Sequence, residues 1–362
     1  MPAAAYHDML GRYETFREVF DDSKDRGVDD GASVPRFALT EYNVFACIGK
    51  GAYACAFAAR HTKSGRIVAL KRMQKQHIVK SEMQEFVRNE VELLSELRNL
   101  RCVPKIIGTA ADDSFVYIAM EYLPGGEMLD VVNRFGGLTE RPHCQFVAAC
   151  VSRAVAAVHR HGIVFRDLKL ENLVVDATGY LRLIDFGLAK RSLVRTYTMC
   201  GSPRYCSPEL ITGRGVSFAG DWWSLGICLY ECFFGYTVFD GDGDSADLWQ
   251  NILFQPIEFH HSSSRRASEE FKEFLTRLLE RDPTKRLGSS TGLLHRISDQ
   301  KWFDGFDWNA FDERLMRAPY IPSAESENEI AKRGIECDSQ EFEAGKYIAS
   351  SDSSPGWLKA FS

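Results

Sequence analysis

Residues 163–172 bring a carboxylate, an ammonium and an amide into one short stretch. Asp167 comes first, Lys169 stands two residues later and Asn172 five residues later. A loop with these groups can accept a proton, neutralise a phosphate and hold a metal ion. A charged surface turn is the plain alternative, and this stretch alone does not choose between the two.

A second stretch carries glycines that could approach a phosphate. It lies between two strand-like segments and reads Ile48-Gly49-Lys50-Gly51-Ala52-Tyr53-Ala54. Glycine lets a backbone come close to a phosphate, whose oxygens the N–H groups can bind. A simple β-turn explains the glycines at least as well, so the phosphate interpretation needs support from other residues.

Lys71 gives part of that support, because it ends the apolar stretch Val68-Ala69-Leu70. Burying an unpaired ammonium is costly, so this lysine needs an anion. Glu90 on the following helix is one candidate partner, and a nucleotide phosphate is another. Glu90 has apolar neighbours at helical spacing, which favours a buried position over a solvated one.

A further carboxylate stands at the end of an apolar strand in Leu183-Ile184-Asp185-Phe186-Gly187. A carboxylate in such a place, before a flexible glycine, suits a hard cation such as Mg²⁺.

The elements that must position these groups follow from periodicity. Residues 42–120 are mainly strand-like with a helical insertion near 82–98, 121–126 form a connector, and 127–303 are mostly helical. We therefore expect an α+β chain with a β-rich small lobe that has one key helix, a hinge and a helical large lobe. Residues 1–41 are expected to form an amphipathic helix (6–20) and a linker, and 304–362 a tail too short to bury much core alone.

Composition excludes several classes of protein. The net charge of −6 matches that of residues 304–362, which hold 12 acidic and 6 basic residues. No basic patch indicates nucleic acid binding, and no apolar run is long enough to span a membrane. Neither a signal peptide nor the glycine needed for myristoylation is present, because Pro2 follows the first residue. Ten cysteines without zinc-like spacing indicate reduced thiols, hence a cytoplasmic protein, with the nucleus as an open second location.

The separate features occur together in the order of the protein-kinase signature set. They are the glycine-rich loop, Lys71, Glu90, Arg166-Asp167, Asn172, Asp185-Phe186-Gly187 and Ser207-Pro208-Glu209. Residues 42–303 thus resemble a protein kinase domain, with small lobe 42–120 and large lobe 121–303. The resemblance implies the bilobal protein-kinase fold and the use of ATP and Mg²⁺.

The resemblance also implies a role for each matched residue. Lys71 would hold the α- and β-phosphates, fixed by Glu90, and Asp167 would take the proton of the acceptor hydroxyl. Lys169 would steady the γ-phosphate, while Asn172 and Asp185 would bind the Mg²⁺ ions. The residues expected around ATP are Ile48, Gly49, Lys50, Gly51, Ala52, Tyr53, Ala54, Ala56, Ala69, Lys71, Met120, Glu121, Leu123, Glu127, Glu171, Asn172, Val174 and Asp185.

Two matched carboxylates would stabilise the large lobe. Asp221 resembles the buried carboxylate that braces the catalytic loop, and Glu209 resembles the one that pairs with Arg286.

The chain resembles the AGC group of serine/threonine kinases in particular. Phe165 stands where most kinases have His and this group has an aromatic residue, and the tail carries Ala318-Pro319-Tyr320-Ile321-Pro322. Residues 121–128, 221–226 and 307–308 are most similar to catalytic subunits of the cAMP-dependent kinases. By that resemblance Phe342 would cover ATP, and the aromatic end at Trp357 to Phe361 would dock beside the helix of Glu90.

The same resemblance implies how the kinase is activated and how it selects substrates. Thr198 matches the activation-loop phosphothreonine, with Arg166, Lys190 and Arg195 as its candidate partners. Three acidic positions would read arginines upstream of the acceptor, namely Glu127, Glu171 and Glu231. An apolar pocket after the acceptor would be formed by Met199, Pro203 and Cys206.

The expected partners are protein substrates with upstream arginines, of the form Arg-Arg-x-Ser/Thr. The chain contains such a sequence, Arg265-Arg266-Ala267-Ser268, although Ser268 also fits a helix N-cap. A regulatory cyclic-nucleotide-receptor subunit is an open further partner. Other AGC kinases remain alternatives, and so does a pseudokinase scaffold, because Ala54 and Ala56 replace a glycine and a valine of relatives.

Overall fold

A computed structural model describes residues 34–51, 53–191, 196, 201–241, 245–259, 266–289, 295–323, 326–335 and 356–361. The chain forms two compact units. Among the described residues, the small unit contains 34–124, 185–187 and 322–361, and the large unit contains 125–184 and 188–321. The helix expected at 6–20 and the linker after it, up to residue 33, lie outside the described residues.

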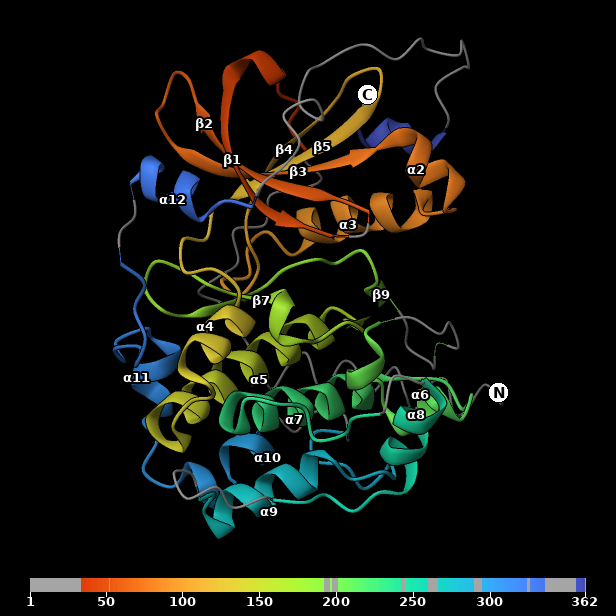
Figure 1. Ribbon diagram of the computed structural model, residues 1–362, viewed down its shortest axis with the longest axis vertical. Coiled ribbons are helices and arrows are strands. Elements are labelled where there is room, and N and C mark those ends of the chain that lie inside the picture. The colour runs from red at the N-terminus through yellow and green to blue at the C-terminus, as the bar shows by residue number, and fades with distance from the viewer. Residues whose placement is uncertain are drawn as a thin grey trace. The chain divides into compact units, whose positions relative to one another are not determined.

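The small unit is built on one antiparallel five-stranded sheet (Figure 1). Its strand order is β1-β2-β3-β5-β4. The strands are β1 (Tyr42–Lys50), β2 (Cys55–His61), β3 (Ile67–Gln74), β4 (Ile106–Ala111) and β5 (Phe115–Glu121). Apolar residues such as Phe57, Val68 and Leu70 form a buried cluster on one side of this sheet. Burial of this face holds the strands in register, because a shift by one residue would expose it.

Helix α3 (Gln84–Glu96) carries Glu90 on its buried side. Val87, Glu90, Val91 and Leu94 are all buried and follow the 3.6-residue repeat. The predicted helix near 82–98 is therefore confirmed. A short preceding helix, α2 (Lys75–Lys80), was not predicted, because it buries only Ile78 and has no apolar repeat.

Two later segments of the chain complete the small unit. Helix α12 (Glu327–Arg333) packs on β1, and its Ile330 is buried. The 3-10 turn η7 (Gly356–Ala360) packs on α3, with Trp357 and Phe361 buried, and the Thr109 hydroxyl donates to the Ala360 carbonyl at 2.9 Å. The expected docking of the aromatic end beside the helix of Glu90 is confirmed. Phe342 lies outside the described residues.

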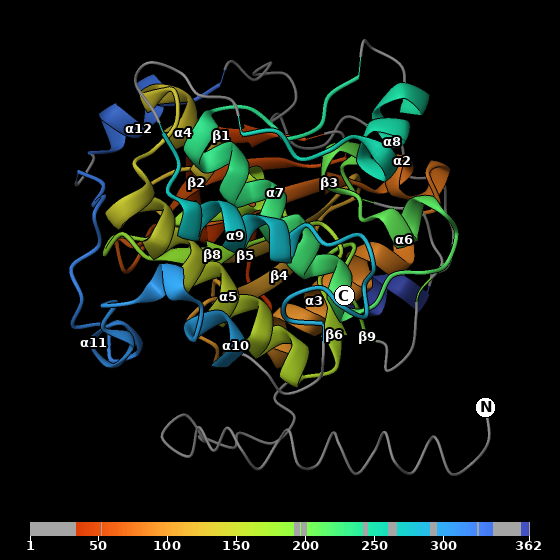
Figure 2. The same cartoon turned by 90° about the horizontal axis from the view of Figure 1, so that it is seen from below.

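The large unit is mostly helical. Its longer helices are α4 (Met128–Phe135), α5 (Gln145–Arg160), α7 (Phe218–Phe234), α8 (Ser245–Phe254) and α9 (Glu269–Leu278). In Figure 1 α7 lies between α5 and α9, and in the view from below of Figure 2 α9 lies in front of α7; α7 contacts both helices. Most of α7 is buried, which explains its nearly continuous apolar sequence. In the described residues, no helix is long and apolar enough to cross a bilayer.

Short elements complete the large unit and shape its loops. The strands β6 (Ile163–Val164) and β9 (Lys190–Arg191) pair with each other, as do β7 (Leu173–Val175) and β8 (Leu181–Leu183). The short helices and turns are η2 (Glu140–Cys144), η3 (Leu170–Asn172), η4 (Pro203–Tyr205), α6 (Pro208–Ile211), α10 (His295–Ser298), η5 (Lys301–Phe303) and α11 (Trp308–Asp312). The predicted α+β class and the division into a sheet-rich and a helical lobe are confirmed.

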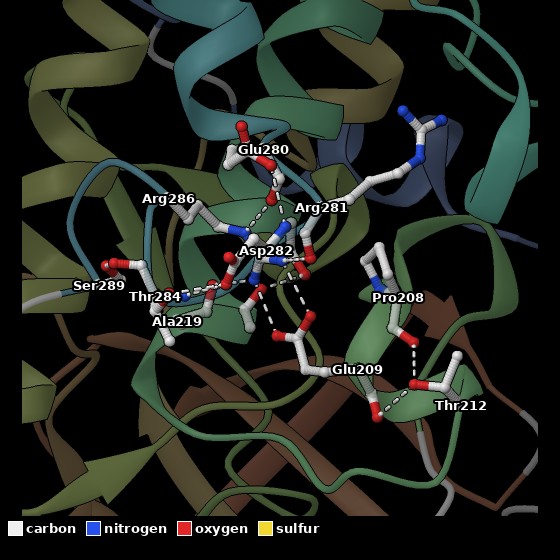
Figure 3. A network of polar contacts seen from close by, with 12 residues as sticks. Pro208, Glu209, Thr212, Ala219, Glu280, Arg281, Asp282, Thr284, Arg286 and Ser289 are labelled. Atoms are coloured by element: carbon white, nitrogen blue, oxygen red, sulfur yellow. Dashed lines mark hydrogen bonds and ion pairs between the residues drawn. The ribbon is translucent and has the colours of Figure 1, made fainter.

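A buried ion pair connects α6 to a later loop of the large unit (Figure 3). The two terminal nitrogens of Arg286 bind the two carboxylate oxygens of Glu209, each at 2.8 Å. Arg286 also donates to the carbonyls of Ala219 and Glu280 at 2.8 Å. The pairing of Glu209 with Arg286 is confirmed.

Ser268 caps helix α9. Its hydroxyl accepts from the Phe271 N–H at 3.2 Å and lies 2.6 Å from a Glu140 carboxylate oxygen. Trp302 donates its ring N–H to the same oxygen at 2.9 Å. The interpretation of Ser268 as an N-cap is confirmed.

Candidate active site

In the small unit, Lys71 lies between two carboxylates. Its ammonium is 2.6 and 2.8 Å from the two oxygens of Glu90 and 3.2 Å from Oδ1 of Asp185. Burial opposes the charged ammonium, but the carboxylates of Asp185 and Glu90 outweigh it and hold the pKa of Lys71 above its usual value. The predicted ion pair with Glu90 is present, and the lysine is charged.

The sheet places an apolar surface beside this ammonium. Ala56 pairs with Lys71 across β2 and β3, and Ala69 pairs with Met120 across β3 and β5. Side chains alternate along a strand, so Ala56, Lys71, Ala69 and Met120 share one face. Each is only partly buried, whereas Phe57 and Leu70 on the opposite face are fully buried. This face can therefore receive a flat apolar group next to the Lys71 ammonium.

The glycine-rich segment makes a tight turn between β1 and β2. The Gly51 N–H donates to the Ala54 carbonyl at 2.8 Å, and the Tyr53 side chain is exposed. Ile48, Gly49 and Lys50 end β1, while Ala52 lies outside the described residues. Glu121 ends β5, and Leu123 in the connector is buried.

Asp185 has a strained backbone with φ of 65°. Non-glycine residues rarely adopt this left-handed conformation, and such strain often accompanies function. Phe186 after it is buried, and the Phe186 carbonyl accepts from the Asn89 amide at 3.3 Å. The Asp185 carboxylate accepts from the Gly187 N–H at 3.3 Å, and the Asp185 side chain is 47% exposed. Asp185 thus presents an anionic oxygen pair that solvent and ligands can reach.

In the large unit, Asp221 braces the loop that precedes Asp167. Its carboxylate accepts from the N–H groups of Phe165 at 2.9 Å and Arg166 at 2.8 Å, and lies 2.7 Å from His159 Nε2. Arg166 has a left-handed φ of 69°, which these bonds help to fix. The predicted bracing role of Asp221 is confirmed, whereas His159 was not predicted.

Asp167, Lys169 and Asn172 meet around the buried carboxylate of Asp167. The Asn172 amide nitrogen donates to the Asp167 carbonyl at 2.8 Å and to its Oδ2 at 2.9 Å. The Lys169 ammonium is 3.0 Å from the same Oδ2. The Ser202 N–H donates to Oδ1 at 3.1 Å, and Lys169 donates to the Ser202 hydroxyl at 2.9 Å. The loop is a restrained polar site and not a solvated turn.

Ser202 was not predicted, because nothing in its local sequence marks it. Its position depends on Gly201, which has φ of 95°. A Cβ at Gly201 would lie 2.8 Å from the Arg166 carbonyl, so only glycine fits against the loop.

Three carboxylates of the large unit form an acidic cluster: Glu127, Glu171 and Glu231. Burial, with the charges of Asp130 and Glu171, raises the pKa of Glu127 to about 7. Burial, with the charge of Glu171, also raises the pKa of Glu231, whose carboxylate accepts from the Tyr205 hydroxyl. Such mutual repulsion favours a cationic ligand, since a guanidinium would stabilise all three in their charged forms.

One oxygen of the acidic cluster has no donor. Within the described part of the chain, Oε2 of Glu171 is buried and makes no hydrogen bond. A buried carboxylate oxygen without a donor is costly, and a bound cationic group would satisfy it.

The stretch around Thr198, called here the activation segment (residues 188–202), is described only in part. Arg166 donates from Nε to the Leu188 carbonyl at 2.6 Å and from Nη1 to the Thr196 hydroxyl at 3.4 Å. Lys190 lies exposed in β9, opposite Val164. The predicted Arg195, Thr198 and Met199 lie outside the described residues.

The segment after the activation segment holds the other predicted pocket residues. Pro203 begins η4, and Cys206 directly follows η4, with its thiol 3.6 Å from the Ser202 carbonyl. Arg204 lies on the exposed side, 3.1 Å from Asp240. Val174 of β7 forms an isolated antiparallel β-bridge with Glu127.

A model of the protein kinase domain matches residues 42–303. The chain belongs to the protein kinase family. It is similar to AGC kinases, among them cGMP-dependent protein kinase 2 of Rattus norvegicus, with 35% identity over 295 residues, 79% of this chain and 38% of that protein. It is also similar to the human cAMP-dependent protein kinase catalytic subunit PRKX, with 31% identity over 288 residues, 80% of this chain and 78% of that one. The chain thus spans well under half the length of the cGMP-dependent kinases it matches.

Proposed function

We propose that this chain is a serine/threonine protein kinase, which transfers the γ-phosphate of Mg-ATP to Ser or Thr in basic, Arg-Arg-x-Ser/Thr-like sequences. The observation that carries the proposal is the charged ammonium of Lys71, fixed by Glu90 and Asp185 beside a half-exposed apolar face of the sheet. The cation suits the phosphates of a nucleotide, and the apolar surface suits its base.

The large unit supplies the groups for transfer in this proposal. Asp167 accepts the proton of the acceptor hydroxyl, and the bonds from Asn172 and Ser202 hold it in place. Lys169 lies 3.0 Å from Asp167 and neutralises charge on the transferring phosphoryl group.

Asn172 and Asp185 are the residues that hold Mg²⁺ in this proposal. They offer carboxylate and amide oxygens, which are the ligands that this hard cation prefers. The Asn172 amide nitrogen already donates to Asp167, so its amide oxygen is the ligand atom. When bound, the metal neutralises phosphate charge.

The acidic cluster supports a preference for arginines upstream of the acceptor. Glu127, Glu171 and Glu231 repel one another, and Oε2 of Glu171 has no donor in the described part of the chain. Arginine pairs with carboxylates through two bonds, and a charged hydrogen bond contributes about 1.5–3 kcal/mol. Two upstream arginines therefore give strong selection.

The finer proposal is a kinase of the cAMP-dependent catalytic-subunit type, supported by the likeness to PRKX. A regulatory cyclic-nucleotide-receptor subunit is then its partner, and the cytoplasm and nucleus are its compartments. The likeness to cGMP-dependent kinases supports the alternative, another AGC kinase.

Phosphorylation of Thr198 completes the proposal. A phosphate there adds about −1.5 to −2 charges that Arg166 can bind. Thr198→Ala should lower turnover strongly, and an unchanged rate would reject this role.

A pseudokinase scaffold is the rival function. It is favoured by Ala54, which replaces a more flexible glycine of relatives, and by Ala56, which replaces a larger valine. The decisive experiment incubates the full chain with Mg-ATP and a peptide that contains Arg-Arg-Ala-Ser, with Asp167→Ala as the control. We expect serine phosphorylation by the wild type alone, and at least about tenfold less with Ala-Ala-Ala-Ser. Equal, background-level signals from both proteins would favour the scaffold.

A further inference from the structure

A cavity of about 360 Å³ lies in the large unit, and none of its lining residues is assigned above to ATP or substrate. Its walls come from α4, the start of α5, the β7–β8 hairpin and the tail residues Pro319 and Tyr320. The buried wall includes Met128, Val131, Leu138, Phe146, Val147 and Leu181.

The tail closes one side of this cavity. A Cβ at Gly179, at the tip of the hairpin, would lie 2.2 Å from the Tyr320 carbonyl and 2.4 Å from the Ala318 Cβ. Tyr320 also makes an edge contact with Phe135 of α4, with ring centroids 6.4 Å apart. The wall is thus held against the hairpin by close packing and is not a loose flap.

The chemistry of the lining selects a neutral ligand. No lining residue carries a carboxylate, an ammonium or a guanidinium. Burial lowers the pKa of His143, so its ring is neutral at pH 7. A charged ligand would leave water without a counter-charge, which is costly.

The lining of the cavity includes the polar side chains of Thr139 and His143. The Thr139 hydroxyl lies 2.7 Å from Nδ1 of His143 and donates to the Arg141 carbonyl at 3.1 Å. In the tautomer in which Nδ1 of His143 donates to Thr139 and Thr139 donates to the Arg141 carbonyl, Nε2 of His143 is an acceptor. A ligand hydroxyl or N–H can donate to Nε2.

We propose that this cavity binds a neutral, compact, two-ring aromatic molecule with one hydrogen-bond donor. A dry cavity of about 150 Å³ is enough for benzene. The cavity here is more than twice that size and within the range of small-molecule sites, which begins at about 300 Å³. An α-helix, at about 10–12 Å across with its side chains, is too wide for it.

The cavity also borders the acidic cluster. Met128 in its wall directly follows Glu127, and Val175 exchanges backbone hydrogen bonds of 3.0 Å with Gly125 and Gly126. A ligand that moves these walls therefore moves Glu127. This coupling rests on the proposed function, whereas binding itself does not.

The probe for binding is N-phenyl-1-naphthylamine, a neutral two-ring fluorophore with one N–H. We expect saturable one-site binding to the full chain with Mg-ATP present and without peptide, because ATP keeps the probe off the partly exposed apolar face beside Lys71. Val147→Trp, which fills the cavity, should weaken binding by on the order of tenfold or more. Phe254→Ala is the matched control, because Phe254 is 75% exposed on α8 and should not affect binding.

The result that would overturn the site is binding that survives Val147→Trp or is lost in Phe254→Ala. If Val147→Trp fails to fold, Val131→Phe tests the same space and His143→Phe tests the hydrogen bond to Nε2. Saturating probe should also shift KM for the Arg-Arg-Ala-Ser peptide at least about twofold, and an unchanged KM rejects the coupling. An inactive kinase that still binds the probe separates failure of the proposed function from failure of the site.

Discussion

Two buried ion pairs, one in each unit, differ in what else their cations can bind. Arg286 and Glu209 are 0% and 2% exposed, and the remaining donors of Arg286 go to backbone carbonyls. The Lys71 side chain is 17% exposed, and its second carboxylate, Asp185, is 47% exposed. Lys71 can therefore exchange one anion for a phosphate, while Arg286 cannot.

The comparison teaches how a structural ion pair differs from one that can serve binding. A structural pair satisfies every donor from inside the fold. A binding pair keeps one partner that solvent can reach. Substitutions in the two pairs should therefore affect different measurements.

The largest effect is expected from Arg286→Met. It leaves the Glu209 carboxylate buried without its counter-charge, which costs about 3–5 kcal/mol of unfolding free energy. Urea unfolding measures this loss. The double variant Arg286→Met with Glu209→Leu should recover part of it, and a loss below about 1 kcal/mol would contradict the structural role.

The next effect is expected from Lys71→Met, which lowers activity and also costs some stability, because Glu90 is only 3% exposed and loses its counter-charge. Removing a preorganised charge from a transferring group typically lowers kcat by about 10²–10³. Steady-state kinetics with the Arg-Arg-Ala-Ser peptide measures it, with Lys75→Met as the control, because the Lys75 ammonium donates to the backbone carbonyl of Asp112. A Lys71→Met enzyme with a tenth or more of wild-type kcat would remove the distinction between the two pairs.

The acidic cluster of Glu127, Glu171 and Glu231 should make peptide binding depend on pH, which neither ion pair is expected to do. The pKa of Glu127 is about 7, so the carboxylate is protonated below that value and charged above it. A guanidinium binds only the charged form, so KM for the Arg-Arg-Ala-Ser peptide should fall roughly tenfold from pH 6 to pH 8. Glu127→Gln should flatten this dependence, and an equally steep profile in that variant would assign the titration to another group.

The smallest effect is expected at Ser268, where the donors to the Glu140 carboxylate in the described part of the chain are all neutral. Ser268→Ala removes the N-cap of α9 and should cost about 1 kcal/mol. Thermal unfolding measures it, and Ser268→Thr, which keeps a cap, is the control. Equal melting temperatures for the alanine variant and the wild type would show that the cap contributes nothing.

The sequence identified the groups whose chemistry depends on type and order. Lys71, Glu90, Asp221 and the pairing of Glu209 with Arg286 follow from a recognised pattern, and the structure shows their contacts. The alternation of apolar residues also predicted the sheet, because burial of one face imposes it.

Other features could not be predicted, because they depend on packing between distant segments. Ser202 reaches Asp167 only because Gly201 fits against the Arg166 carbonyl. The raised pKa of Glu127 arises from burial and from the charges of Asp130 and Glu171, and Glu171 is 44 residues away in the chain. The cavity depends on how side-chain volumes from four segments fail to fill a space, and no local pattern records that.

The position of η7 in the small unit has a consequence for biosynthesis. Residues 34–124 form the sheet and α3, but Trp357 and Phe361 are added more than 200 residues later. At about 5–20 residues per second, the surface that receives these aromatic rings stays uncovered for roughly 10–50 s on the ribosome. The small unit is thus completed only when residues 357–361 have been synthesised. Until then its uncovered apolar surface is a site that a chaperone would bind.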